Sequence, residues 1–229
     1  EAVAEQEVVF IMDRFGYAKT LDTSVYERNQ EAVDSENKYV LRCMNTDRIC
    51  LFTDTGVLHQ VKVFDIPAGK LKDKGQPIDN LGNYSSSGER IAGLFPMGYL
   101  KGHMLLFTTE QGMIKQVAAE EFDVTRRTVV ATKLADDDKV LRVDRIEQEK
   151  ELILRTEEGV FLRFPISEVP EKKKGAVGVR AIQLGAKDKV EECYLLMGEE
   201  EAIEYKEKKI SLSRIKLANR DGKGTKLRV

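Results

Sequence analysis

Internal repetition is the feature that most restricts how this chain of 229 residues can fold. A short apolar run, a few polar residues that include a glycine, and a second apolar or alternating run recur roughly every 45 residues, a spacing typical of repeat architectures. Runs rich in Val, Ile, Leu, Phe and Thr favour strands, and glycine supplies the positive φ of a tight turn. Each copy is therefore predicted to be a β-hairpin. The copies cover residues 8–20, 49–61, 104–117, 151–164 and 193–206.

The residue at the turn marks the register of the repeats. It is Gly16, Gly56, Gly112 and Gly159 in the first four copies, and Glu201 takes its place in the fifth. Residues at the same offset from this turn are expected at equivalent places in successive units.

Basic connectors lie between the hairpins, with glycine in those of 68–95 and 171–196, and each leads to an alternating segment, an acidic turn and a further apolar strand. They begin the stretches 68–95, 122–143 and 171–196. Carboxylates in the acidic turns at 136–138 and 186–189 are expected to accept hydrogen bonds from free backbone N–H groups. Each unit then holds about four strands, which is the size of a propeller blade.

The predicted fold class is all-β, a propeller-like array of about five four-stranded blades in a single domain over 1–229. No stretch keeps a 3.6-residue apolar period, so little helix is expected. A sandwich or barrel with glycine turns would show the same alternation, and the absence of Trp counts against the commonest propeller repeat. The repeats are expected at about 7–47, 48–102, 103–149, 150–191 and 192–229.

Composition excludes several classes of protein. With 41% hydrophobic residues the chain is too apolar for disorder, and no apolar run reaches the ~18–20 residues of a membrane span. Two histidines and three cysteines without C-x-x-C spacing argue against a disulfide framework or a zinc site, and favour a reducing cytosol. The first ten residues are acidic, unlike a signal peptide, and the start at Glu1 rather than Met indicates a piece of a longer protein.

The net charge of −2 hides a strong segregation of charge. Residues 206–229 are rich in Lys and Arg, whereas residues 190–204 contain Glu but neither Lys nor Arg. Basic residues recur at matched places: Lys19, Lys115 and Arg163 follow the hairpin turn, and others lie in the connectors. In a radial array they would form a basic track for a polyanion with regularly spaced phosphates. The alternative is that they are ordinary solvated surface charges.

Several elements resemble one known family. FGYAKT at 15–20, QGMIKQV at 111–117 and KGAVGVRAIQL at 174–184 are similar to repeats of the C-terminal domain of bacterial type IIA topoisomerase A subunits, namely the A subunits of DNA gyrase and of topoisomerase IV. The most specific match is VFDIPAGKLKDKGQPIDNL at 63–81, followed by GERIAGLFPM at 88–97. The resemblance extends over essentially the whole chain.

The resemblance implies a β-pinwheel, a propeller-like ring or spiral whose blades exchange strands with their neighbours. Double-stranded DNA would wrap on its basic outer edge, and the domain would present the transport segment to a catalytic core that lies outside this chain. The implied partners are that core and the ATPase B subunit, in the cytoplasm at the nucleoid, with no membrane, no cofactor and no metal. The sequence shows no GxxxxGK[ST] loop for ATP and no DxD cluster for magnesium.

The recurrence of basic residues and the resemblance together imply a set of DNA contacts. The candidate residues are Lys19, Arg28, Lys70, Lys72, Lys74, Lys115, Arg126, Arg127, Arg163, Lys172, Lys173, Lys174, Arg180, Arg220, Lys223 and Lys226.

One departure from the family bears on the choice between its two branches. Gyrase A subunits carry a basic glycine-rich box resembling QRRGGRG after the first hairpin, but the stretch here, 26–40, has no such heptad and is net acidic. This favours a topoisomerase IV A subunit, with a gyrase A subunit carrying a degenerate box as the alternative. A weaker echo, NRDGKGTK at 219–226, matches an ordinary connector between blades.

Two other functions fit the pattern of repeats. A propeller-like platform for protein interactions, without a nucleic-acid role, is compatible with the near-zero net charge. An enzyme with its site in the centre of a ring is disfavoured, because the chain offers two histidines and no evident pairing of nucleophile and base. Cys43 and Cys50 are expected to pack as small apolar groups.

Overall fold

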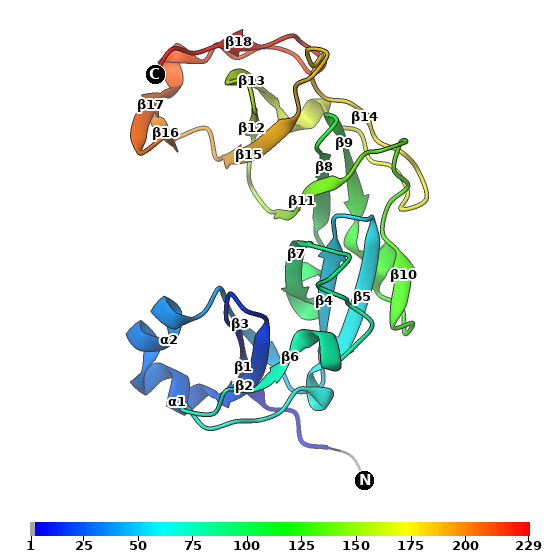
Figure 1. The fold of residues 1–229 in the computed structure, drawn as a ribbon, viewed down its shortest axis with the longest axis vertical. Helices are drawn as coiled ribbons and strands as arrows, with labels where there is room; N and C mark the ends of the chain where they lie inside the picture. Colours follow the sequence, from blue (N-terminus) through cyan, green and yellow to red (C-terminus); the bar gives the residue numbers. More distant parts are fainter. Residues whose placement is uncertain (1–2) are drawn as a thin grey trace. The chain divides into compact units, whose positions relative to one another are not determined.

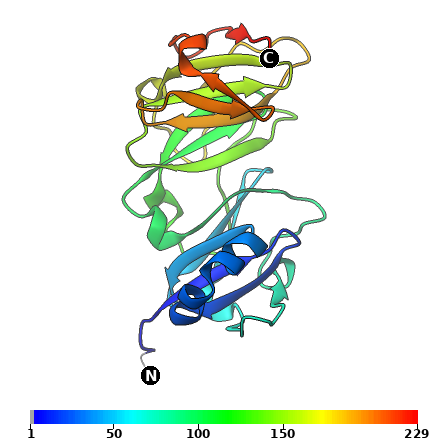
Figure 2. The same ribbon diagram turned by 90° about the vertical axis from the view of Figure 1, so that its left-hand side faces the viewer.

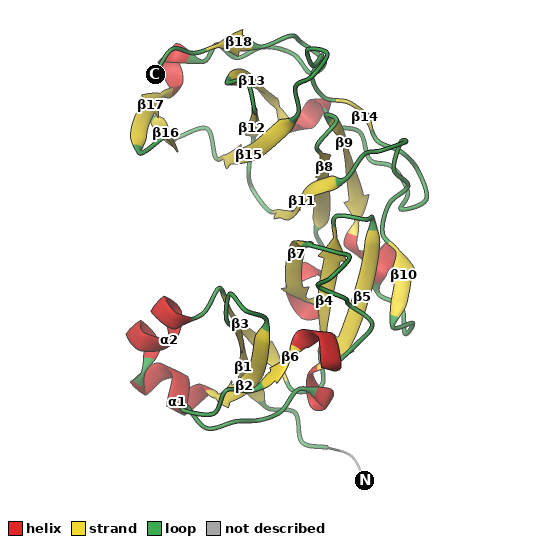
Figure 3. Cartoon of the chain, in the orientation of Figure 1, coloured by secondary structure: helices red, strands yellow, loops and turns green. Residues whose placement is uncertain are grey.

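The structure is a computed structural model that describes residues 3–229. Its regular secondary structure is mostly short antiparallel strands, which are joined by turns and long loops (Figures 1 and 3). The strands are β1 (Glu7–Met12), β2 (Tyr17–Asp22), β3 (Tyr39–Met44), β4 (Arg48–Thr53), β5 (Val57–Lys62), β6 (Gln76–Pro77), β7 (Ile91–Pro96), β8 (Met104–Thr109), β9 (Met113–Ala118), β10 (Thr128–Val130), β11 (Val140–Ile146), β12 (Glu151–Thr156), β13 (Val160–Pro165), β14 (Val179–Arg180), β15 (Val190–Leu196), β16 (Ala202–Tyr205), β17 (Lys208–Ser211) and β18 (Thr225–Lys226).

Helices are few and short. The α-helices of residues 3–229 are α1 (Thr23–Arg28), α2 (Gln30–Glu36) and α3 (Met97–Leu100), and single 3₁₀ turns lie at Val63–Asp65, Ile78–Asn80, Ala119–Phe122, Ile166–Glu168 and Leu212–Arg214. None of these helices is both long and apolar enough to cross a membrane.

Contacts within the chain gather into two compact units. The first holds the residues up to Thr53 together with Val57–Lys101 and Asp123–Val129. The second holds Asp54–Gly56, Gly102–Phe122 and Val130–Val229.

Each unit contains two four-stranded antiparallel sheets, named blades 1 to 4 in chain order. Blades 1 and 2 have the strand orders β3-β1-β2-β6 and β10-β5-β4-β7, and blades 3 and 4 have the orders β11-β8-β9-β14 and β15-β12-β13-β18. The two central strands of every blade form one of the predicted hairpins, and Gly16, Gly56, Gly112 and Gly159 have φ between 82° and 90° in their turns. These four hairpins are confirmed.

The outermost strand of each blade comes from the following repeat. β6, β10, β14 and β18 lie beyond the next hairpin or connector in the sequence, yet they pair with β2, β5, β9 and β13 of the preceding blade. These exchanged strands are only two or three residues long. The implied exchange of strands between neighbouring blades is therefore present in the structure.

The fifth hairpin lies further along the chain than the sequence pattern predicts. β15, the first half of the predicted hairpin, pairs instead with β12 as an outer strand of blade 4. The hairpin is the two-stranded sheet β16–β17, and its turn is formed by Lys206 and Glu207 at φ 51° and 62°. Glu201 therefore does not occupy the turn, and this last sheet has two strands rather than four.

Helices α1 and α2 occupy the stretch after the first hairpin, where the sequence pattern predicts no helix. They lie across one face of the blade 1 sheet (Figure 2). Tyr26 and Val33 pack there with Val9, Ile11 and Leu21 in one buried cluster. The helices thus bury a sheet face that would otherwise be exposed to water, and this burial rather than an intrinsic helical period stabilises them.

Candidate nucleic-acid interface

The predicted basic connectors lead directly into the exchanged strands. Connector 1 (68–75) precedes β6, connector 2 (123–127) precedes β10, connector 3 (171–178) precedes β14, and connector 4 (217–224) precedes β18. Each connector crosses the edge of one blade to deliver the strand that completes it. The candidate residues that lie on the connectors therefore occupy similar places relative to the exchanged strands.

Glycine before the exchanged strand is required by a close approach of two backbones. A Cβ atom at Gly178 would lie 2.5 Å from the carbonyl oxygen of Ile114 in β9, and one at Gly224 would lie 2.7 Å from that of Phe161 in β13. Gly75 has φ +84°, and a Cβ atom there would lie even closer to the backbone of Ala18 in β2. Glycine is thus a packing requirement at these three exchanged strands, whereas Arg127 stands directly before the exchanged strand β10 in blade 2.

Lys19 lies inside blade 1 and is only 5% exposed. Its ammonium group donates hydrogen bonds to the carbonyl oxygens of Lys70 and Leu71, each at 2.8 Å, and also to that of Asp73. Burial lowers the pKa of Lys19, and the carboxylates of Asp73 and Glu36 oppose that shift. The Lys19 side chain thus holds the backbone of connector 1 from inside the blade.

Lys115 has the same role in blade 3. It is 1% exposed, and its ammonium group donates to the carbonyl oxygens of Lys173 at 3.0 Å, Lys174 at 3.3 Å and Ala176 at 2.7 Å. Burial lowers its pKa to about 8, against the opposing charge of Glu121. Both lysines lie three residues after the turn glycine, so the recurrence seen in the sequence is real, but the expected surface position of these side chains is wrong.

Arg163 also points into the protein rather than toward solvent. It forms an ion pair with Glu151 (Nε–Oε1, 2.7 Å) and donates to the carbonyl oxygens of Leu212 and Ile215 at 3.3 and 3.2 Å. It lies one position later than the two lysines relative to the turn glycine. Leu162 occupies the position in blade 4 that Lys19 and Lys115 hold in theirs.

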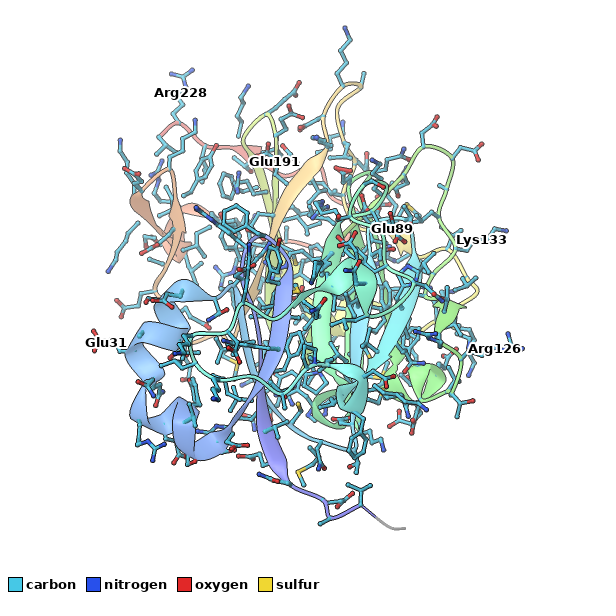
Figure 4. All side chains as sticks on the ribbon, turned by 60° about the horizontal axis from the view of Figure 1, so that its bottom comes forward. Glu31, Glu89, Arg126, Lys133, Glu191 and Arg228 are labelled. Atoms are coloured by element: carbon cyan, nitrogen blue, oxygen red, sulfur yellow. The ribbon has the colours of Figure 1, made fainter. Side chains whose placement is uncertain are left out.

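Blade 2 secures its connector through Gln60. The side-chain amide donates to the carbonyl oxygens of Val124 and Arg126 at 2.8 and 2.7 Å, and its oxygen accepts from Arg48 at 2.8 Å. The side chains of Arg126 and Arg127 are exposed, and Arg126 projects away from the ribbon (Figure 4). The sequence pattern did not reveal Gln60, because a polar residue in an alternating strand carries no distinctive signal.

Connector 4 differs in that its arginine, Arg220, bonds to the protein. Arg220 donates to the carbonyl oxygens of Glu168 at 2.9 Å and Arg180 at 2.8 Å. Arg180, which lies in β14 rather than in this connector, forms an ion pair with Asp221 of connector 4. Lys223 and Lys226 are exposed. Two of the candidate cations here are therefore neutralised or occupied, which weakens the case for this connector relative to connectors 1 and 3.

The other candidate residues are mostly accessible. Lys174 is half-buried, and its Nζ donates to the Glu121 carbonyl oxygen at 3.2 Å, while Lys74 Nζ lies 4.1 Å from the centre of the Tyr17 ring. Arg28 is exposed in the last turn of α1. The remaining candidates on the connectors, all exposed, are Lys70, Lys72, Lys172 and Lys173.

The acidic turns have the predicted capping role. Asp138 Oδ1 accepts from the backbone N–H groups of Gln111 and Lys139 at 2.9 and 2.7 Å. Asp188 Oδ1 accepts from Glu158 and Lys189 in the same way, at 3.0 and 2.9 Å. Each carboxylate thus bonds the hairpin turn of its own blade as well as its own turn, which fixes the outer strand against the hairpin.

A polar cluster that sequence reasoning missed lies in blade 2. His59 Nε2 is 2.9 Å from Glu89 Oε1, and its Nδ1 is 3.0 Å from Thr128 Oγ1 on the exchanged strand β10. Asn83 donates to the same hydroxyl at 2.9 Å. The cluster ties the GERIAGLFPM segment to the outer strand. Among residues 3–229 no group of three or more His, Cys, Asp or Glu side chains is arranged to hold a metal ion.

Comparison with known proteins agrees with this architecture. The family model of the DNA gyrase C-terminal domain, beta-propeller, matches residues 103–147 and 150–194. The A subunit of DNA gyrase from Escherichia coli (strain K12) is 31% identical over 202 residues, which are 83% of this chain and 23% of that protein. The A subunit of DNA gyrase from Lawsonia intracellularis is 28% identical over 207 residues, 86% of this chain and 25% of that protein. The chain thus spans about a quarter of the length of these curated relatives.

Solved structures show the same fold. The crystal structure of the C-terminal domain of DNA topoisomerase IV superposes with a TM-score of 0.84 at 25% identity, over 98% of this chain and 73% of the other. The E. coli ParC C-terminal domain gives a TM-score of 0.76 at 16% identity, over 97% of this chain and 94% of the other. The all-β, β-pinwheel fold is therefore confirmed. The chain belongs to the family of C-terminal domains of bacterial type IIA topoisomerase A subunits, which includes those of DNA gyrase and topoisomerase IV.

Proposed function

We propose that this chain binds double-stranded DNA without regard to sequence and bends or wraps it, so that the transport segment is presented to the catalytic core of a type IIA topoisomerase. The observation that carries the proposal is the equivalence of connectors 1 and 3. Each is a loop outside the regular strands, held at the same edge of its blade, with several lysines directed to solvent. Lysines repeated in this way suit a ligand whose charges repeat regularly.

The proposed phosphate contacts are the accessible members of the candidate set. Lys19, Lys115 and Arg163 are left out because their charged groups are buried against backbone carbonyls or Glu151. The proposed contacts are Arg28, Lys70, Lys72, Lys74, Arg126, Arg127, Lys172, Lys173, Lys174 and, with weaker support, Arg180, Arg220, Lys223 and Lys226.

A topoisomerase IV A subunit is the favoured parent. The stretch where a gyrase A subunit carries its basic glycine-rich box forms α1 and α2 here, and the exposed Glu27, Glu31 and Asp34 make that surface acidic (Glu31 is labelled in Figure 4). A gyrase A subunit is the second candidate, since the curated relatives reported above are gyrase A subunits. An assay of the full enzyme, with A and B subunits assembled, distinguishes the two candidates. A gyrase with a closing basic box introduces negative supercoils, whereas an enzyme without that box decatenates and relaxes DNA.

The proposal extends to partners and location. The chain would act beside the catalytic core of its own A subunit, together with the ATPase B subunit, in the cytoplasm at the nucleoid. The enzyme's strand transfer belongs to that core, so this chain contributes DNA geometry and no chemistry.

Binding to duplexes of unrelated sequence tests the proposal. We expect affinity that falls steeply with salt, because each neutralised phosphate contributes ~0.9 to the slope of log K against log salt. The triple variant K172E/K173E/K174E should weaken binding equally on every sequence, since phosphate contacts carry no base information. The matched control K206E/K208E/K209E makes the same charge change on exposed residues of β16–β17 and its turn, outside the proposed contacts, and should have a much smaller effect.

Two outcomes would overturn the proposal. Absence of binding at ~50 mM salt would favour a platform for protein interactions, the remaining alternative. Equal losses in the connector variant and the control would show that net charge alone, rather than the connectors, governs the interaction.

A further inference from the structure

We propose that Lys19 and Lys115 are positioning residues for DNA binding: each fixes the backbone of a basic connector from inside the blade without touching the nucleic acid. This inference rests on the proposed function and names what holds its contact surface in shape. The supporting observation is the same in two separate blades. A buried ammonium group is enclosed by three carbonyl oxygens of the loop that also bears the exposed lysines.

The two connectors share backbone hydrogen bonds at matched places. Gly69 N donates to Thr20 O in blade 1, and Lys172 N donates to Gln116 O in blade 3. Within the loops, Asp73 N bonds Lys70 O as Ala176 N bonds Lys173 O, each at 3.0–3.1 Å. Both loops therefore have the same fold, and in both the lysine reaches the first, second and fourth carbonyl of the same turn.

Because the carbonyl oxygens of the connector point toward the buried lysine, the cationic side chains of the connector point toward solvent. A loop whose carbonyl oxygens converge on a central donor must turn its side chains away from that donor. Three carbonyls around one nitrogen need three N–H donors, which only the charged ammonium form of lysine supplies. Removing the side chain would leave the Leu71 or Lys174 carbonyl without the donor shown here, and a loop with unpaired buried carbonyls rearranges toward water.

Blade 4 shows that strand exchange alone does not require this lysine. It has the same exchanged strand and the same close-packed glycine, Gly224, yet Leu162 stands at the lysine position. Its connector is held instead by Arg220, whose guanidinium donates to backbone carbonyls and is therefore less available to another ligand. An internal lysine is thus found where the connector keeps several lysines free for another ligand.

The decisive experiment is a double-mutant cycle in the 229-residue chain. K115M is combined with K172A/K173A/K174A, and dissociation constants for a random-sequence duplex are measured over a range of salt. If Lys115 acts through the connector, K115M alone should weaken binding about as much as the triple variant, roughly tenfold at moderate salt. It should have little further effect in the triple-variant background, because residues that act as one unit are not additive.

Two controls separate positioning from simple loss of charge. K187M removes the charge of an exposed lysine in the same compact unit, on the acidic turn at 186–189 rather than on a connector, and should change affinity less than twofold. K115R keeps the charge, but a planar guanidinium does not fit a cage built for a compact ammonium, so it should weaken binding as K115M does. Amide hydrogen exchange over 171–178 should accelerate at least tenfold in K115M, while β12 and β13 keep their protection.

The outcomes are distinguishable. Wild-type binding by K115M or K115R, unchanged exchange over 171–178, or full additivity in the cycle would overturn the positioning role. If the triple variant itself binds like the wild type, the proposed connector contacts fail instead. Should K115M unfold at the assay temperature, K19M tests the same inference on connector 1 in the other compact unit.

Discussion

Replacement of Gly178 by alanine tests the structural basis of strand exchange. Gly178 directly precedes β14, and a Cβ atom there would lie 2.5, 2.7 and 3.0 Å from the carbonyl O, C and N atoms of Ile114. All three are backbone atoms of β9, whose other edge is paired with β8. No flexible side chain can move aside, so the strain has to be relieved by displacement of β14 itself.

The magnitude follows from what that displacement breaks. Overpacking that side chains can relieve costs about 1–3 kcal/mol. Here β14 would lose its two pairs with β9, Val179↔Ile114 and Arg180↔Met113, and the bond from Ala181 N to Gly112 O. Each such hydrogen bond contributes about 0.5–1.5 kcal/mol net. We therefore expect G178A to lower the free energy of unfolding by about 2–4 kcal/mol, with the loss limited by detachment of the exchanged strand.

Urea unfolding provides the measurement, followed by far-UV circular dichroism and tyrosine fluorescence, since the chain has no Trp. The control is G175A in the same connector, where a Cβ atom meets nothing within 4 Å. That substitution should leave stability within about 0.5 kcal/mol or raise it slightly, because alanine restricts the unfolded chain. Equal stability of G178A and G175A would refute the close-approach argument, as would unchanged amide protection of β9 in G178A.

Three further predictions concern buried polar and ionisable groups. Burial raises the pKa of the thiols of Cys43, Cys50 and Cys193 to about 12, so none should react with a thiol reagent at pH 8 before unfolding, and rapid labelling of any of them would contradict their burial. Because the folded state holds these protons more tightly than the unfolded chain, the free energy of unfolding should fall as the pH rises from about 9 toward 12; a flat stability profile there would contradict this. H59A removes one hydrogen-bond partner of the largely buried Glu89 carboxylate, which also accepts from Ser85 N–H, and should lower the free energy of unfolding by about 1–3 kcal/mol without altering the salt slope of DNA binding; a loss below ~0.5 kcal/mol would contradict the role of the cluster.

The sequence was sufficient for the hairpins because two independent signals coincide there. Apolar alternation marks the strands, and a glycine with positive φ marks each of the first four turns. In the fifth copy only the alternation remained. The prediction followed the polar run at Glu201, whereas the turn is made by Lys206 and Glu207, two residues that take positive φ without glycine.

The exchanged strands could not be predicted from the residues alone. A strand of two residues, such as β6 or β14, is too short to show any period. Its pairing partner lies far back in the sequence and is set by the path of the connector. The sequence signal of an exchanged strand is a glycine that packs against another backbone. In the sequence alone, that glycine cannot be distinguished from an ordinary turn residue.

The candidate interface was predicted in part. The recurrence of lysine after the turn glycine is real, but Lys19 and Lys115 face inward because their strands are buried on both faces from Ala18 to Leu21 and at Ile114 and Lys115. A charge in such a strand is compatible with burial only if a loop supplies acceptors, and that loop is contributed by the next repeat. The exposed lysines of the connectors were identified correctly as accessible, and their contact with DNA remains a prediction.

The exchange of strands also orders the events of biosynthesis. When the ribosome has delivered β1, β2 and β3, the sheet they form still has β2 as an open edge, and this edge closes only after β6 has emerged at Gln76–Pro77. Blade 2 in turn waits for β10, and blade 3 for β14. Nascent chains should therefore become protease-resistant in steps that trail each hairpin by the following hairpin and its connector, and a deletion of a single repeat would leave the preceding blade with an unpaired strand edge as well as removing its own blade.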